Sequence, residues 1–235
     1  MNRPALPSCA SRISVPEPTG RLVFGGIDPT GSEAKASGVA LLDGAGQRAR
    51  MARVHTDAEI LAFFQPYRRS LRYLGLDGIC KLPDGLHPCC VTPQGPPCLC
   101  QQTAPRPGRT AEWALSSLGI GCYYTSKRAF AKSWITRSLH LFTLLTAAGF
   151  TVLEIYPYAS KRRLFGRQLP NKATRVGRQL LSAHIQGLGI TLEHGRAYTH
   201  DELDAVLVAY TAYLHAQGRT IEVGEDIDGT VVIPR

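Results

Sequence analysis

The stretch "RLVFGGIDPTGSEAKASGVALLDGAGQRARMARVH" (residues 21–55) contains three short apolar segments that are separated by turns. Residues 21–28 and 37–43 are apolar runs that each end in an acid, and residues 48–55 alternate weakly between apolar and polar side chains. Such segments are typical of β-strands. Connections this short join antiparallel neighbours, because parallel strands need a crossover of about a dozen residues or more. The stretch therefore predicts a three-stranded antiparallel meander.

An alternation of helices and strands follows the meander. Thr56 and Thr199 each begin a Thr-x-x-Glu capping box before apolar residues at helical spacing, which is typical of a helix start. A meander followed by β-α units is the order of the ribonuclease H-like fold, which actin-like ATPases and sugar kinases share. We therefore expect an α/β fold with a ribonuclease H-like mixed five-stranded sheet flanked by helices. The expected helices cover residues 56–69, 109–119, 127–149, 171–189 and a segment from 199, and the other expected strands cover 72–78, 150–157 and 229–234.

The chain of 235 residues is long enough for one sizeable domain and short for two. Residues 1–20 are broken by prolines and are expected to form a flexible N-terminal segment, which leaves residues 21–235 as a single domain. Within that domain, residues 79–108 are rich in proline and cysteine without periodicity, which predicts an irregular insertion. The pattern contains neither the apolar core of a signal peptide nor a membrane-spanning run. We therefore expect a cytoplasmic protein with no membrane partner.

Basic residues outnumber acidic ones by 27 to 18, which gives a net charge of +9. This excess suits a polyanion such as nucleic acid, although a basic surface that only confers solubility is an alternative. Basic side chains recur along the predicted helix 127–149, where Arg137 is one of them, and beyond the strand that follows it. Interleaved aromatic residues favour stacking of bases beside phosphate contacts, with Tyr156 and Lys161 as candidates. DNA or RNA is the expected partner, and the oligomeric state stays open.

Acidic residues recur at corresponding places in the predicted elements. Asp28 ends the first strand, Asp77 ends the fourth, and Glu154 lies near the end of the fifth. Asp201 and Asp204 lie one turn apart at the start of the last helix, which is close enough for both carboxylates to face one point. Because the first and fourth strands are neighbours in a ribonuclease H-like sheet, we expect these acids to converge at one edge.

Each acid also has a local interpretation. The acids at strand ends can shape turns, Asp201 can complement the helix dipole, and Glu154 can pair with Lys161 or Arg162. A converging cluster, however, repels itself and is penalised by burial unless a cation is bound, and Mg²⁺ and Mn²⁺ prefer oxygen ligands. Two such ions can activate a water and stabilise the leaving oxygen in phosphodiester hydrolysis. We therefore expect Asp28, Asp77, Asp201 and Asp204 to bind two Mg²⁺ or Mn²⁺ ions, and the same four residues with Glu154 to be catalytic.

Segments spread along residues 21–234 carry a family likeness. They are "GGID" (25–28), "LGLDG" around Asp77, "RTAEWALSSLGI" (109–120), "VLEIYPYAS" (152–160), "THDELDAVLVAYTA" (199–212) and "GTVVIP" (229–234). This set resembles domain-of-unknown-function family 429, whose members are regarded as predicted nucleases with a ribonuclease H-like fold. The resemblance implies the same acidic metal site, and it implies that Arg109 and Glu112 match a family Arg-x-x-Glu pair near that site. The family usually follows its second acid with a small residue and proline, whereas Gly-Ile-Cys-Lys-Leu-Pro follows Asp77 here.

Two further groups of residues have more than one interpretation. His200 can orient a water or act as a base beside the acids, or can simply be exposed. The cysteines of the insertion lack paired Cys-x₂-Cys spacings, so they indicate either reduced thiols or a zinc site. These cysteines are Cys80, Cys89, Cys90, Cys98 and Cys100, with His87 nearby.

These residues favour a metal-dependent nuclease that hydrolyses phosphodiester bonds of nucleic acid at a two-metal carboxylate site. The expected substrate-binding residues are Arg109, Glu112, Tyr156, Lys161 and His200. The first alternative is a non-catalytic nucleic-acid-binding module of the same fold. The second is an actin-like ATP-dependent phosphotransferase, although "GIDPTGSEAKASG" (26–38) is only faintly like the phosphate-binding hairpin of such enzymes.

Overall fold

A computed structural model describes residues 23–93, 98–100, 106–193 and 196–235, so the expected N-terminal segment 1–20 lies outside the described residues. The main sheet has five strands in the order β3-β2-β1-β4-β5. β1 pairs antiparallel with β2, and β2 with β3, whereas β4 is parallel to both β1 and β5. The prediction of an α/β fold with a mixed five-stranded sheet is confirmed. The strands are β1 (Val23–Asp28), β2 (Ser37–Asp43), β3 (Ala49–Val54), β4 (Leu71–Leu76) and β5 (Val152–Glu154).

The expected helices form, together with elements that the sequence pattern did not predict. β5 is shorter than the strand expected over 150–157, because Pro157 occupies the first turn of a helix, where proline is favoured. The chain ends in a two-stranded antiparallel hairpin of β6 (Thr220–Glu225) and β7 (Gly229–Pro234), of which only β7 was predicted. The helices are α1 (Asp57–Phe64), α2 (Thr110–Ser117), α3 (Lys132–Ala147), α4 (Pro157–Phe165), α5 (Arg175–Gly187) and α6 (His200–Ala216), with short 3₁₀ turns at Gln65–Tyr67 and Pro88–Cys90.

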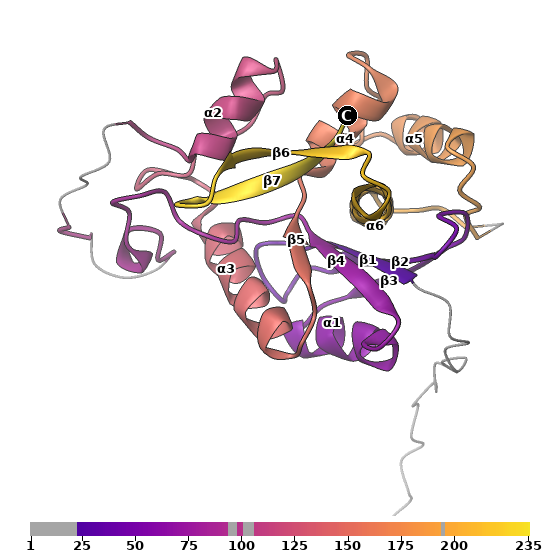
Figure 1. The fold of residues 1–235 in the computed structure, drawn as a ribbon, viewed down its shortest axis with the longest axis horizontal. Helices are drawn as coiled ribbons and strands as arrows, with labels where there is room; N and C mark the ends of the chain where they lie inside the picture. Colours follow the sequence, from indigo (N-terminus) through magenta and orange to yellow (C-terminus); the bar gives the residue numbers. More distant parts are fainter. Residues whose placement is uncertain (1–22, 94–97, 101–105, 194–195) are drawn as a thin grey trace, which may run out of the picture.

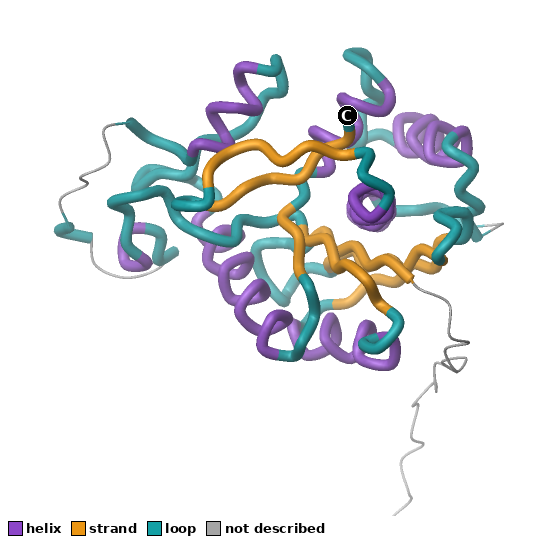
Figure 2. The backbone as a smooth tube through the Cα atoms, in the orientation of Figure 1, coloured by secondary structure: helices purple, strands orange, loops and turns teal. Residues whose placement is uncertain are grey.

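The sheet separates two layers of helices (Figures 1 and 2). α1 and α3 cover one face, where Ile27, Phe64 and Leu141 belong to one buried cluster. α6 crosses the other face and lies between the sheet and an outer layer of α4, α5 and the β6-β7 hairpin (Figure 1). Because α6 is covered on both sides, its side chains from Glu202 to Ala212 are all buried, as its apolar sequence predicts.

Three glycines allow α6 to lie directly on the sheet. A Cβ atom at Gly26 would lie 2.0 Å from the carbonyl oxygen of Ala205, and one at Gly38 would lie 2.1 Å from that of Asp201. A Cβ at Gly75 would lie 2.5 Å from a side-chain methyl of Val208. These glycines leave β1, β2 and β4 without side chains where the helix passes, so the first turn of the helix lies close to the strand ends.

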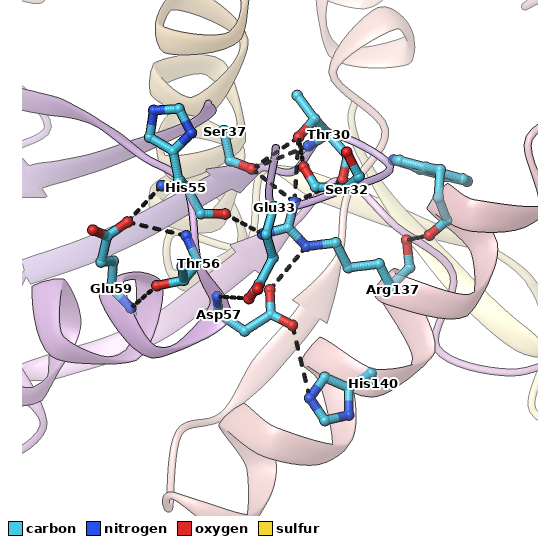
Figure 3. Close-up of polar contacts among 12 residues, drawn as sticks. Thr30, Ser32, Glu33, Ser37, His55, Thr56, Asp57, Glu59, Arg137 and His140 are labelled. Carbon is cyan, nitrogen blue, oxygen red and sulfur yellow. Dashed lines mark hydrogen bonds and ion pairs between the residues drawn. The ribbon is translucent and has the colours of Figure 1, made fainter. Parts of the chain in front are cut away.

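Arg137 of α3 holds the loop after β1 in place (Figure 3). Its guanidinium donates to the carboxylate of Asp57 at 2.8 Å, to the carbonyl oxygen of Thr30 at 3.0 Å and to that of His55 at 2.8 Å. Only 7% of its side chain is exposed. Arg137 therefore crosslinks α3, α1 and the loop that follows Asp28, and its placement on an exposed phosphate-binding face was wrong.

The expected irregular insertion at 79–108 contains only the 3₁₀ turn Pro88–Cys90 among its described residues. None of the helices in the described part of the chain combines the length and the apolar character needed to cross a membrane.

Candidate active site

Asp28 and Asp77 lie next to each other at the carboxyl ends of β1 and β4. Ile27 pairs with Leu76 in the parallel ladder, and the backbone N–H of Asp77 continues it by donating to the carbonyl oxygen of Ile27 at 2.9 Å. The two side chains are close enough to form a hydrogen bond when one of them is protonated. Asp28 is buried and Asp77 is partly buried. The strand register thus brings together two acids that are far apart in the sequence.

Asp204 comes to the same place from α6. The helix begins with a complete capping box, in which the backbone N–H of Glu202 donates to the Thr199 hydroxyl and the Glu202 carboxylate accepts from the backbone of Thr199. Thr199 and Glu202 therefore cap the start of the helix without help from Asp204, which is only 2% exposed. Its charge acts on both Asp28 and Asp77.

Burial and mutual repulsion make the charged forms of these acids unfavourable. Burial is the largest cause that raises the pKa of Asp77 to about 7, followed by the charge of Asp204. Burial, followed by the charges of Asp77, Asp204 and Asp201, raises the pKa of Asp28 well above its ordinary value. Among the described residues, no N–H group donates to either carboxylate. The oxygens of Asp28 and Asp77 are therefore available to a hard cation, which would relieve the repulsion.

Two lysines compensate the charge of Asp204. The ammonium of Lys161, on α4, donates to both carboxylate oxygens of Asp204 at 2.8 and 3.1 Å, and it is buried with its partner. Lys172, before α5, lies 3.6 Å from the same carboxylate with 55% of its side chain exposed. Burial lowers the pKa of Lys172, but Asp204 and the other acids outweigh this effect and raise it. Lys161 is thus an internal counterion, whereas Lys172 presents its charge to solvent.

Asp201 and His200 lie at the rim of the site. The Nε2 atom of His200 is 2.9 Å from a carboxylate oxygen of Asp201, and their side chains are 41% and 23% exposed. Asp201 affects the pKa of Asp28 less than Asp77 and Asp204 do. The structure therefore brings Asp28, Asp77 and Asp204 together and leaves Asp201 at their edge.

Glu154 has a different environment from the other acids. The guanidinium of Arg109 binds both of its oxygens, at 2.5 and 3.0 Å, and the backbone N–H of Cys80 donates to it at 2.8 Å. The alternative pairing of Glu154 with Lys161 or Arg162 was wrong, because the pattern gave no sign of a partner 45 residues earlier. Arg109 also donates to the carbonyl oxygens of Asp228 and Gly229 at 2.7 and 3.1 Å, so it joins β5 to the terminal hairpin.

Glu112 completes this structural group. Its carboxylate accepts from the backbone N–H of Arg109 at 3.1 Å and from both the backbone and the hydroxyl of Thr125 at 2.7 and 2.5 Å. Arg109 and Glu112 are both buried. The hydrogen bonds of Arg109, Glu112 and Glu154 join distant parts of the chain, and they position the wall of a cavity.

That cavity, of about 670 Å³, opens beside the acids. Asp77, Asp204, Lys161 and Lys172 contribute to its lining, together with Arg109, Glu112 and Glu154. The hydroxyl of Tyr156 donates to the carbonyl oxygen of Gly121 at 3.1 Å and so fixes one wall. The cavity is otherwise rich in aromatic rings, which are Tyr123, Tyr124, Phe130, Trp134, Tyr156 and Tyr158.

Sequence reasoning placed Lys172 in a basic segment but did not assign it to the site. Its approach to Asp204 depends on how the loop before α5 folds over α6, and the spacing of residues carries no signal for that contact. Comparison of the chain with protein-family models, with curated proteins and with solved structures gave no match.

Proposed function

We propose that this protein is a metal-dependent nuclease of ribonuclease H-like fold, related to domain-of-unknown-function family 429. The observation that carries the proposal is the meeting of Asp28, Asp77 and Asp204, where the first two carboxylates have raised pKa values and no N–H donor among the described residues. Carboxylate oxygens in this arrangement fit Mg²⁺ or Mn²⁺. Asp28 and Asp77 are the proposed metal ligands.

A bound Mg²⁺ or Mn²⁺ ion would supply Lewis acidity and a more acidic water for phosphodiester hydrolysis. Lys161 holds the carboxylate of Asp204 in a fixed position by contacting both of its oxygens. Lys172 is exposed beside the acids and is placed to bind a phosphate oxygen. Asp204, held by Lys161, would stay beside the proposed metal ligands and add its negative charge to the site.

The aromatic lining favours nucleic acid over a small phosphodiester. Tyr123 and Phe130 are 78% and 77% exposed, and their rings meet edge to face with centroids 4.9 Å apart. Exposed rings beside a cationic group are typical of surfaces that stack unpaired bases. Single-stranded nucleic acid, or a strand with a displaced base, is therefore the proposed substrate class.

The test is cleavage of a panel of single-stranded and duplex DNA and RNA in Mg²⁺, Mn²⁺ or EDTA. We expect metal-dependent cleavage that falls at least ~100-fold in Asp28→Asn and Asp77→Asn, because the ligands are lost. Asp84→Asn is the matched control, since Asp84 is an exposed acid outside the site. Binding without cleavage in either metal would instead favour a nucleic-acid-binding module, and stabilisation by ATP would favour a phosphotransferase.

A further inference from the structure

The described part of the insertion brings three of its cysteines and a histidine together in one cluster. The ligand atoms of His87, Cys89, Cys90 and Cys100 all lie within 4.8 Å of one another. The Sγ atoms of Cys89 and Cys100 are 3.3 Å apart. His87, Cys89 and Cys90 lie at the 3₁₀ turn, and the chain returns to them at Cys100, ten residues after Cys90.

The sulfur separations are too long for a disulfide and are closer to those of thiolates that share one metal ion. A disulfide holds its sulfurs about 2.0 Å apart, whereas a tetrahedral zinc site with Zn–S bonds of about 2.3 Å separates them by about 3.8 Å. The thiol of Cys98 also lies 3.6 Å from the Sγ of Cys89 and 3.5 Å from that of Cys90. Cys98 does not, however, belong to the group of four ligand atoms that all lie within 4.8 Å of one another. We propose that His87, Cys89, Cys90 and Cys100 bind one structural zinc ion, with Cys98 as an adjacent, non-ligating thiol.

The surroundings of the cluster indicate a structural role. Only a small apolar cluster supports this segment, in which Ile79, Leu86 and Val91 pack with Ile135 of α3. A segment with so little core and almost no regular structure gains folding free energy from a metal. Four protein ligands also close a tetrahedral site, which leaves no position for substrate.

Contacts from the segment lead directly to the cavity. The ammonium of Lys127 donates to the carbonyl oxygen of Cys100 at 2.8 Å, and the hydroxyl of Thr136 donates to that of Val91 at 3.1 Å. Trp134, which packs against the small apolar cluster, also lines the cavity. Three thiolates and a neutral imidazole leave a zinc site with one net negative charge, and Lys127 is the nearby cation. The ion would therefore fix the start of α3 and with it one wall of the cavity.

The proposal is tested on the full chain purified without chelators, by elemental analysis and by chelator competition. We expect one zinc ion per chain and an affinity that falls at least ~100-fold in His87→Ala and Cys100→Ser, because removing a ligand costs at least as much as removing its supporting contacts. Cys122→Ser is the matched control, since the thiol of Cys122 lies outside the cluster and contacts the carbonyl oxygen of Glu112. Cys98→Ser is expected to retain zinc at unchanged affinity.

A spectroscopic measurement separates this site from the acidic one. Co²⁺ bound to the Asp28→Asn variant is expected to give the intense sulfur-to-cobalt absorption of tetrahedral thiolate ligation, lost again when Cys100→Ser is added. Failure of the nuclease assay would leave this result unaffected, because the two sites share no ligand. Removal of zinc from the unmodified chain should increase trypsin cleavage after the exposed Lys81.

Four results would overturn the proposal. The first is a chain without zinc that has fewer than its seven cysteines free when denatured without reductant, which indicates disulfides. The second is a zinc content that is unchanged in Cys100→Ser. The third is a loss of zinc in Cys98→Ser but not in His87→Ala, which refutes the ligand set. Iron in place of zinc in the elemental analysis refutes the identity of the metal.

Discussion

The ammonium of Lys161 contacts both carboxylate oxygens of Asp204, at 2.8 and 3.1 Å, inside the protein. This contact divides the acids of the site into two kinds. Asp204 has a buried cation of its own, whereas Asp28 and Asp77 face each other with raised pKa values. A metal ion would therefore relieve more electrostatic repulsion at Asp28 and Asp77 than at Asp204.

Asp28→Asn is expected to stabilise the metal-free protein while it abolishes metal binding. Removing one of two facing carboxylates relieves repulsion and burial of charge, which should raise the free energy of unfolding by on the order of 1 kcal/mol, or the Tm by about 2–4 °C for a chain of this size. The measurement is thermal unfolding in EDTA and in Mn²⁺. The unmodified protein should gain stability from Mn²⁺ and the variant should not. If the variant were less stable in EDTA than the parent, Asp28 and Asp77 would not be a repelling pair in the metal-free protein.

Stability without metal is expected to fall as the pH rises from about 4 to about 7. The pKa of Asp77 is about 7 in the folded chain against an ordinary value of 3.8, so the unfolded chain binds fewer protons in this range and unfolding becomes more favourable with pH. The contribution is fully present below pH 3.8 and is lost as the pH rises through 7. Urea unfolding in EDTA at several pH values measures it, and Asp77→Asn should flatten the dependence. A parent curve as flat as that of the variant would refute the raised pKa.

Glu154→Gln is expected to reduce stability without removing the metal response. The substitution leaves the buried guanidinium of Arg109 without its counterion, and breaking a buried ion pair costs about 3–5 kcal/mol. Urea unfolding measures this loss, and Glu222→Gln, at an exposed position on β6, is the matched control. Stabilisation by Mn²⁺ should persist in Glu154→Gln. If Mn²⁺ no longer stabilised this variant, Glu154 would belong to the metal site after all.

Gly26→Ala is expected to be among the most destabilising small substitutions in the chain. The new methyl group would lie 2.0 Å from the carbonyl oxygen of Ala205, and because this atom is helix backbone, α6 must move away from the sheet at a cost of about 1–3 kcal/mol or more. Gly187→Ala is the control, because nothing lies within 4 Å of its added Cβ. Metal affinity should fall in Gly26→Ala together with stability, since Asp204 moves with the helix. Unchanged metal binding would show that Asp204 does not contribute.

Arg137→Met is expected to destabilise the chain by about 3–5 kcal/mol, because it leaves Asp57 and two carbonyl oxygens without their buried donor. Arg128→Met, at an exposed position before the same helix, should change stability by less than about 0.5 kcal/mol. Chemical unfolding of both variants measures the difference. A similar effect of the two substitutions would mean that the Arg137 crosslink carries no net stability.

The sheet and the meeting of the acids were predictable because their signals are local. Asp28 and Asp77 each end an apolar strand, and strand register alone places them together once β1 and β4 are known to be neighbours. The helix start at Thr199 was equally readable from its capping box. A strand end and a helix cap are decided within a few residues, so the sequence pattern carries them.

The partners of the buried charges were not predictable in the same way. Arg109 and Glu154 are 45 positions apart, and Lys161 and Asp204 are 43 apart, so the spacing of residues says nothing about which pairs form. α4 was missed because its sequence, "PYASKRRLF", is basic with few apolar residues, and β6 because its alternation is interrupted by glycine and charge. Tertiary contacts decided these features, and local preference did not.

The packing of α6 on the glycines of the sheet also sets the order in which the cluster of acids can form during synthesis. The strands that carry Asp28 and Asp77 leave the ribosome well before residues 200–216, which form α6. Until that helix is made, the glycine-lined face of the sheet has nothing to pack against, and the two acids at its edge lack Asp204. The nascent chain therefore has its strand-end carboxylates before it has Asp204, and the cluster of acids is complete only after α6 has been made and has packed on the sheet.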